Sequence, residues 1–116
     1  MMTSSRLACG DVWFVDFGRP ISHEQGFRRP ALVVSVDAYT QGPAALAVVV
    51  PLTRRDKAVR WQVPIRAPEA GLAADGFVKC DDVRSVSIVR FGRYVGQVTP
   101  STLRAVEDRL RILLDL

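Results

Sequence analysis

The sequence predicts a small α+β domain in which a curled antiparallel β-sheet or barrel is followed by one helix. Three observations support this prediction. Six or seven short β-rich segments follow one another with only brief turns between them. A clear helical spacing of apolar residues occurs near the end of the sequence. The length of 116 residues is typical of one domain, so residues 1–116 are expected to form a single folding unit.

The predicted strands differ in how much apolar surface they carry. Segment 45–52, ALAVVVPL, is apolar on both faces, which predicts a central strand. Pro51 lacks a backbone N–H, so strand pairing should be interrupted there. In segment 77–81, FVKCD, the two-residue period of a strand predicts that Lys79 and Asp81 share one face. The remaining predicted strands are 11–17, 30–36, 60–65, 84–89 and 93–98.

The helix predicted after residue 98 has a recognisable start and one apolar face. Thr99 is a suitable N-cap, and Pro100 fits the first helical position because its missing N–H is not needed there. Leu103, Val106 and Leu110 recur at helical spacing. We therefore expect this helix to cover the sheet without taking part in chemistry.

Composition and charge narrow the possible classes of protein. With 48% hydrophobic and 24% charged residues, the chain has the composition of a globular protein. A net charge of +4 favours a polyanionic partner such as RNA, or an acidic protein. Residues 1–9 do not form a secretory signal, and the longest apolar run, 44–52, is too short to cross a bilayer. These features predict a cytoplasmic protein that does not enter a membrane.

Cysteine and histidine usage argues against a metal or a cofactor. Two cysteines, Cys9 and Cys80, lie far apart in the sequence, and there is one histidine. Without a Cys-x-x-Cys pair or a second histidine, a zinc site is not expected. The sequence also lacks a glycine-rich nucleotide-binding loop, so no cofactor is predicted.

Charged residues that could carry chemistry gather on the loop between the first two predicted strands and near segment 77–84. They are His23, Glu24, Gln25, Arg28, Arg29, Lys79, Asp81 and Arg84. Cleavage of RNA needs little more, because the ribose 2′-hydroxyl is a built-in nucleophile. A carboxylate or histidine can accept its proton, and arginine or lysine can hold the phosphate. The simpler alternative is a polar hairpin loop in which Glu24 only pairs with Arg29.

Several motifs in the same order give these residues a context. They are GDVWFVDF at 10–17, HEQ at 23–25, RRPALVVS at 28–35, VVVPLT at 48–53, FVKCDDVRSV at 77–86 and GQV at 96–98. Together they resemble the MazF/PemK/Kid family of toxin endoribonucleases. The resemblance implies a CcdB/PemK-like fold, an SH3-like barrel with a C-terminal helix. It also implies sequence-specific, metal-independent cleavage of single-stranded mRNA, which inhibits translation and growth.

The resemblance implies a role for each matching residue. His23 and Glu24 fall on the loop that contacts RNA and assists catalysis, while Arg29 and Thr53 match active-site residues of the MazF branch. Asp81 matches the general base of the Kid branch, and Lys79 stands where that branch has an arginine. Which carboxylate is the base, Glu24 or Asp81, is left open. The implied RNA-binding residues are Gln25, Arg28, Arg54, Arg55 and Arg84.

Three positions depart from the pattern of the family. Lys79 keeps a positive charge but loses the forked geometry of an arginine. Asp82 replaces the usual glutamine and puts a second acid beside Asp81. Ser22 replaces a glycine before the His-Glu-Gln triplet, so a different turn is expected there.

The resemblance also implies partners and two alternative functions. The expected partners are single-stranded RNA, a second copy of the chain and an acidic antitoxin, with DNA contacted only indirectly through the antitoxin. One alternative is a CcdB-like gyrase-directed toxin. Such toxins act through a C-terminal Trp-Gly-Ile, whereas this sequence has Leu114, Asp115 and Leu116 at that place. The other alternative is a non-catalytic SH3-like module that binds nucleic acid or peptide.

Overall fold

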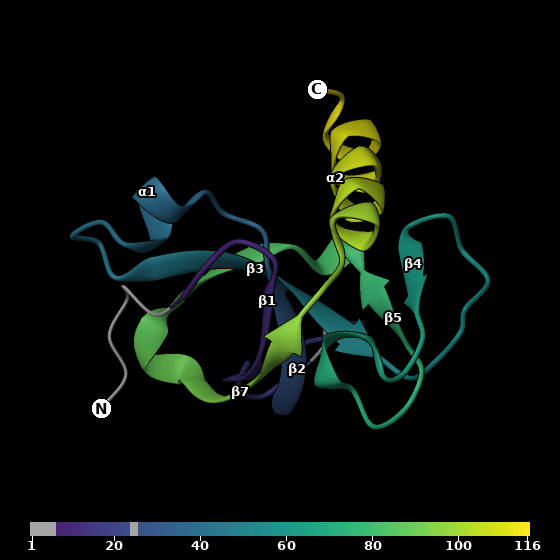
Figure 1. The fold of residues 1–116 in the computed structure, drawn as a ribbon, viewed down its shortest axis with the longest axis horizontal. Helices are drawn as coiled ribbons and strands as arrows, with labels where there is room; N and C mark the ends of the chain where they lie inside the picture. The colour runs from purple at the N-terminus through teal and green to yellow at the C-terminus, as the bar shows by residue number, and fades with distance from the viewer. Residues whose placement is uncertain (1–6, 24–25) are drawn as a thin grey trace.

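The computed structural model describes residues 7–23 and 26–116, and its strands form one sheet with a long C-terminal helix, α2, against it (Figure 1). In this part of the chain the sheet has seven strands, and all of the pairings are antiparallel. The elements are β1 (Asp11–Asp16), β2 (Arg28–Val33), α1 (Asp37–Thr40), β3 (Leu46–Thr53), β4 (Gln62–Ile65), β5 (Gly76–Lys79), β6 (Arg84–Ser87), β7 (Phe91–Gln97) and α2 (Pro100–Leu114).

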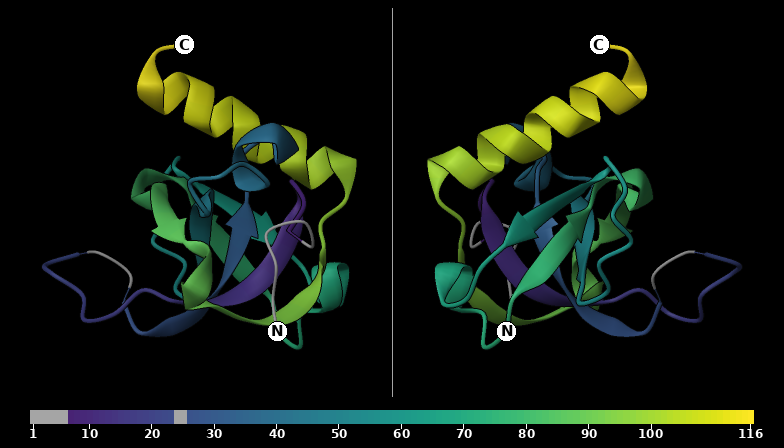
Figure 2. Two further views of the ribbon diagram at one scale, coloured as in Figure 1. Left: turned by 90° about the vertical axis from the view of Figure 1, so that its left-hand side faces the viewer. Right: turned by 90° about the vertical axis from the view of Figure 1, so that its right-hand side faces the viewer.

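The order of the strands confirms the predicted fold class. It runs β4-β5-β3-β2-β1-β7, and β6 also pairs with β3. The sheet curls strongly, and α2 lies across one end of it (Figure 2). Residues 18–23, which follow β1, extend away from the sheet in the same views. Strand β3 is central as predicted, because β2, β5 and β6 all pair with it.

Pairing along β3 changes at Pro51, as its missing N–H predicts. The pairs with β2 run from Val33↔Val49 to Ala31↔Pro51. Beyond Pro51, the last two residues of β3 pair with β5 instead. The change of partner turns the end of β3 away from β2 and toward β5. It places Thr53 opposite Phe77, at the edge where the candidate site lies.

Strand β5 ends earlier than the sequence predicts. Its pairing with β4 stops at Gln62↔Lys79, and Cys80–Asp82 form a 3-10 turn, η3. The Cys80 N–H donates to the carbonyl oxygen of Trp61 at 3.0 Å, and the Cys80 side chain is buried. The prediction that Lys79 and Asp81 share one face of a strand was therefore wrong, because burial of Cys80 turns the chain between them.

Other strand boundaries also differ from the predictions, and two of the differences concern predicted site residues or the end of a strand. Strand β2 begins at Arg28, two residues before the predicted 30–36, so Arg28 and Arg29 belong to the sheet. Asp16↔Arg28 and Val15↔Arg29 extend the β1–β2 ladder to these arginines. Strand β6 ends at Ser87, and a 3-10 turn, η4 (Ile88–Arg90), replaces the rest of segment 84–89.

Helix α2 covers one of the two core clusters. From this helix, Val106 is fully buried in the cluster, and Leu103 and Leu110 are partly buried against it, as their spacing predicts. The predicted start is also confirmed: the Thr99 side chain accepts a hydrogen bond from the Thr102 N–H at 3.2 Å, and Pro100 is the first helical residue. Among the described residues, no helix is both long and apolar enough to cross a membrane.

Candidate active site

A cavity of about 360 Å³ lies where residues 22 and 23, β2 and the ends of β3 and β5 meet. Its lining is almost entirely polar, and five of the eight residues carry a permanent positive charge. The lining residues are Ser22, His23, Arg29, Thr53, Arg54, Arg55, Lys57 and Lys79. We call this hollow the cationic cavity. It gathers five of the predicted RNA-site residues from three separate strands or their ends, together with His23.

The strand ladder holds Arg29 at the wall of the cationic cavity. Arg29 faces Val15 across the β1–β2 pairing, and its Nε donates to the Gly26 carbonyl oxygen at 3.2 Å. The side chain is only partly exposed. A backbone contact on Nε leaves the two terminal nitrogens of the guanidinium to face an anion, which is the geometry that binds phosphate oxygens in pairs.

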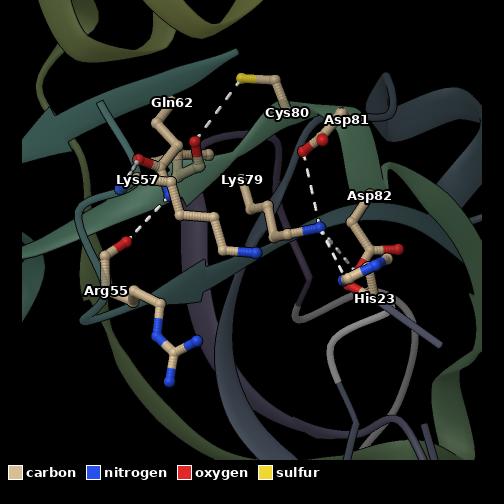
Figure 3. Close-up of polar contacts among 9 residues, drawn as sticks. His23, Arg55, Lys57, Gln62, Lys79, Cys80, Asp81 and Asp82 are labelled. Carbon is tan, nitrogen blue, oxygen red and sulfur yellow. Dashed lines mark hydrogen bonds and ion pairs between the residues drawn. The ribbon is translucent and has the colours of Figure 1, made fainter. Parts of the chain in front are cut away.

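The basic loop after β3, residues 54–57, is held by one buried side chain. Gln62 of β4 accepts from the Lys57 N–H at 3.0 Å, and its Nε2 donates to the Arg55 carbonyl oxygen at 2.9 Å (Figure 3). Thr53 is buried at the end of β3 and accepts from the Arg55 N–H at 3.2 Å. The loop is therefore fixed at three points, so its basic side chains are presented from an ordered backbone.

Lys79 is the most buried cation of the site, with 9% of its side chain exposed. Its Nζ lies 3.6 Å from Asp81 Oδ1 and 3.8 Å from Asp82 Oδ2. It also donates to the His23 carbonyl oxygen at 3.4 Å. Figure 3 shows the ammonium group between the acids of η3 and the segment that carries His23. Such burial is tolerated because each neighbour offsets the loss of hydration.

The two acids of η3 differ in exposure, and neither lines the cationic cavity. The Asp81 side chain is 41% exposed, whereas that of Asp82 is 11% exposed. Both acids pair with Lys79, which lines the cavity (Figure 3). Asp81 is thus connected to the cavity through its ion pair with Lys79.

Other predicted residues lie elsewhere or outside the described residues. Arg84, on β6, places its guanidinium 4.4 Å from the centroid of the Phe17 ring, and it does not line the cavity. Arg28 is exposed on β2 and is also absent from the lining. Glu24 and Gln25 lie outside the described residues. Lys57 also lines the cavity, although it was not among the residues predicted from the motifs. Its position in the basic segment TRRDK, 53–57, is the feature of the sequence that could have indicated it.

Burial keeps the cysteines from acting as nucleophiles. It raises the pKa of the Cys80 thiol to about 11, with a further increase from Asp81 and a smaller opposing effect from Arg109. Burial and nearby acidic side chains also raise the pKa of Cys9. Both thiols are free and are protonated near neutral pH. Across residues 7–23 and 26–116, three or more His, Cys, Asp or Glu side chains do not gather as metal ligands.

Comparison with known proteins identifies the family. The family model described as PemK-like, MazF-like toxin of type II toxin-antitoxin system matches residues 8–114. The chain belongs to this family. The resemblance inferred from the motifs is thereby confirmed.

Individual members of the PemK/MazF family are similar to this chain over most of its length and of their own. Endoribonuclease MazF9 of Mycobacterium tuberculosis is 31% identical over 112 residues, which cover 92% of this chain and 95% of the relative. A crystal structure of MazF from Deinococcus radiodurans superposes with a TM-score of 0.83 at 32% identity, covering 95% of this chain and 97% of the other. The MazE-MazF structure (Form-II) from the same organism gives a TM-score of 0.77 at 30% identity, with 95% and 96% covered.

Proposed function

We propose that this chain is the toxin of a toxin–antitoxin pair and an endoribonuclease that cleaves single-stranded mRNA at a short sequence. The observation that carries the proposal is the cationic cavity, in which five arginine or lysine side chains, a histidine and a buried threonine surround one hollow. A hollow of this kind suits a phosphate flanked by ribose, since the charge that develops on cleavage is then stabilised in place. The named relatives in the PemK/MazF family are endoribonucleases.

The proposed reaction uses the substrate's own nucleophile. A carboxylate removes the proton from the 2′-hydroxyl, and the oxygen attacks the adjacent phosphorus. The bond from phosphorus to the 5′-oxygen breaks, and the departing oxygen takes a proton from water. Arg29 and Lys79 hold the non-bridging oxygens. The products are a 2′,3′-cyclic phosphate and a 5′-hydroxyl, and the step needs neither a metal nor a cofactor.

Two carboxylates remain candidates for the base. Asp81 is favoured because it stands in the FVKCD motif, and its carboxylate lies 3.6 Å from Lys79, which lines the cavity. Glu24 lies on the segment that joins β1 to β2, next to His23 in sequence. In this proposal Lys79 and Arg29 hold the phosphate, Thr53 donates its hydroxyl to a phosphate oxygen, and His23 steers the 2′-hydroxyl. The RNA on either side contacts Gln25, Arg28, Arg54, Arg55 and Arg84.

The proposed partners follow from the same surface. An acidic antitoxin would occupy the cationic cavity in place of RNA, and it alone would contact DNA. A solved structure from a mycobacterial species is of an endoribonuclease in complex with its cognate antitoxin, and it supports an antitoxin as a partner. We further propose a cytoplasmic homodimer. A gyrase-directed toxin and a non-catalytic binding module are not favoured, because the named relatives are endoribonucleases.

The experiment is incubation of the purified chain with a long RNA in excess EDTA, followed by mapping of both new ends. We expect cuts at one short sequence that leave a 2′,3′-cyclic phosphate and a 5′-hydroxyl. Arg29→Ala, purified in the same way, controls for contaminating nucleases. Activity that disappears in EDTA and returns with magnesium would rule out the internal-nucleophile mechanism, and intact RNA under all conditions would rule out the proposed function.

A further inference from the structure

A second cavity adjoins the cationic cavity and differs from it in chemistry. Its volume is also about 360 Å³, and the two share Arg29, Thr53 and Arg54. Away from this shared wall the lining is mostly apolar or backbone, from Phe14, Pro30, Leu72 and Val95 among others. We call it the apolar cavity. A ligand that lies across the shared wall therefore meets positive charge on one side and an apolar hollow on the other.

One side of the apolar cavity offers a flat cationic platform. The guanidinium of Arg93 lies 4.7 Å from the centroid of the Phe14 ring, and both residues line the cavity. Planar guanidinium groups and aromatic rings are the surfaces on which unstacked nucleobases of single-stranded RNA are held. A volume near 360 Å³ is at the small end of ligand pockets, which suits one base and its ribose better than a larger ligand.

The lining of the apolar cavity also carries one carboxylate. Asp75 lines it, and its Oδ1 accepts from the Ala67 N–H at 2.8 Å, which fixes the side chain. A carboxylate repels the phosphates of an RNA backbone. It can, however, accept a hydrogen bond from the exocyclic amino group of adenine, cytosine or guanine, which uracil lacks. Its presence beside a phosphate-binding hollow thus favours contact with a base edge.

The wall that carries Asp75 is held tightly against β7. Gly71 has a φ of 71°, and a Cβ at this position would overlap the Val95 carbonyl oxygen. A Cβ at Gly96 would likewise overlap the backbone of Ala70. Because glycine at both positions allows this close approach, the segment before β5 lies directly on the sheet. The cavity is therefore formed before any ligand binds, which lowers the entropy lost on binding.

We propose that the apolar cavity is a base-selecting subsite of the RNA groove. It takes one unstacked nucleobase next to the cleaved phosphate, stacks it on the Arg93–Phe14 platform, and selects an amino-bearing base through Asp75. The inference rests on the proposed function, since it names the RNA contact that sets the sequence cut by the same site. It assigns specificity to residues 72–75 and 93, outside the cationic cavity.

The test compares cleavage preferences of four proteins on an RNA library with a randomised segment. They are the wild type, Asp75→Asn, Arg93→Ala and the control Arg60→Ala, which also removes an exposed arginine stacked on an aromatic ring, 5.0 Å from Trp61. Asp75→Asn keeps the oxygen that accepts from Ala67 and should fold normally. We expect this variant to lose at least tenfold in discrimination at one position beside the cut, while preferences elsewhere stay the same.

Arg93→Ala should reduce cleavage of the preferred sequence roughly five- to hundredfold, because a stacking surface is lost. Arg60→Ala should match the wild type. If Asp75→Asn and Arg93→Ala both cut with wild-type preference and rate, the subsite is wrong and the endoribonuclease proposal stands. If the wild type does not cut RNA, that proposal fails. In that case the subsite is tested by binding alone, with fluorescence anisotropy of uncleavable 2′-deoxy oligonucleotides that differ at one base. If the wild type and Asp75→Asn show the same preference among these oligonucleotides, the subsite is wrong.

Discussion

The ammonium group of Lys79 donates to the backbone carbonyl oxygen of His23 at 3.4 Å, although 56 positions separate the two residues. This contact connects the end of β5 to the segment that follows β1. On its other side the same ammonium meets Asp81 and Asp82. One buried side chain therefore joins the 3-10 turn, the sheet and the histidine-bearing segment, so its charge has both a structural and a chemical role.

Replacement of Lys79 should affect stability as well as cleavage. In Lys79→Met the partly buried Asp82 loses its cation, and breaking a buried ion pair costs about 3 kcal/mol or more. We expect a lower free energy of unfolding in urea and loss of activity. Lys57→Met is the matched control, because Lys57 lines the same cavity but is exposed, and its stability should change by less than about 0.5 kcal/mol. Equal stability of Lys79→Met and the wild type would refute the structural role.

Substitution of each carboxylate in turn should identify the general base. Asp81→Asn is expected to slow cleavage by roughly 10²–10⁴-fold, which is typical for loss of a well-placed acid–base group. Glu24→Gln should slow cleavage or broaden its specificity without eliminating it. Single-turnover rates on one RNA measure both effects, and Asp108→Asn on α2 is the control. An inactive Glu24→Gln beside a fully active Asp81→Asn would move the base to the segment before β2.

RNA affinity should fall steeply with salt, because each phosphate contact releases counterions. Arg54→Ala and Arg55→Ala should each weaken binding and reduce the slope of log K against log salt concentration by about 0.7, the value for one contact with a single strand. Arg104→Ala, an exposed position on α2, serves as the control. Titrations between low and moderate salt with an uncleavable RNA provide the slopes. Affinity that is indifferent to salt would contradict the assignment of the cationic cavity to phosphate.

The far end of α2 is the surface on which we expect two copies to meet. Ile112, Leu114 and Leu116 are all exposed, and the last turns of α2 project beyond the sheet (Figure 1). Apolar side chains grouped on a surface are typical of interfaces. Light scattering at micromolar concentration should give about twice the chain mass of 12.8 kDa. Leu114→Glu should shift the protein toward the monomer, and Ser101→Glu, at the start of α2, should not. A monomeric wild type would contradict the dimer.

Alkaline pH should destabilise the fold through Cys80. Its pKa is raised by burial from 9.0 to about 11, so the folded state binds the thiol proton more tightly than the unfolded state does. The resulting stabilisation is complete below pH 9 and is lost as the pH rises to about 11. Over this range the wild type should lose up to about 3 kcal/mol more unfolding free energy than Cys80→Ala, at about 1.4 kcal/mol per unit. If the free energies of unfolding of the two proteins change in parallel between pH 9 and pH 11, the predicted effect of Cys80 is absent.

Local patterns in the sequence were sufficient for much of the fold. The apolar alternation, the Thr99–Pro100 helix start and the missing N–H of Pro51 each act over a few residues, so they can be recognised without tertiary information. The motifs around Arg29, Thr53 and Lys79 identified the family in the same way, because they are short and their order is fixed by the chain.

Long-range packing decided the rest. Burial of Cys80 ended β5 and moved Asp81 off the strand, which the two-residue period could not indicate. The change of partner along β3 brought Thr53 to the cavity wall, and the pairing of Lys79 with His23 joined segments far apart in sequence. One part of the apolar cavity's lining is formed by Gly71 and Val95, whose close approach glycine at 71 and 96 permits. Each of these features depends on contacts between distant segments, whose geometry is set by the free energy of the whole fold and not by any local residue pattern.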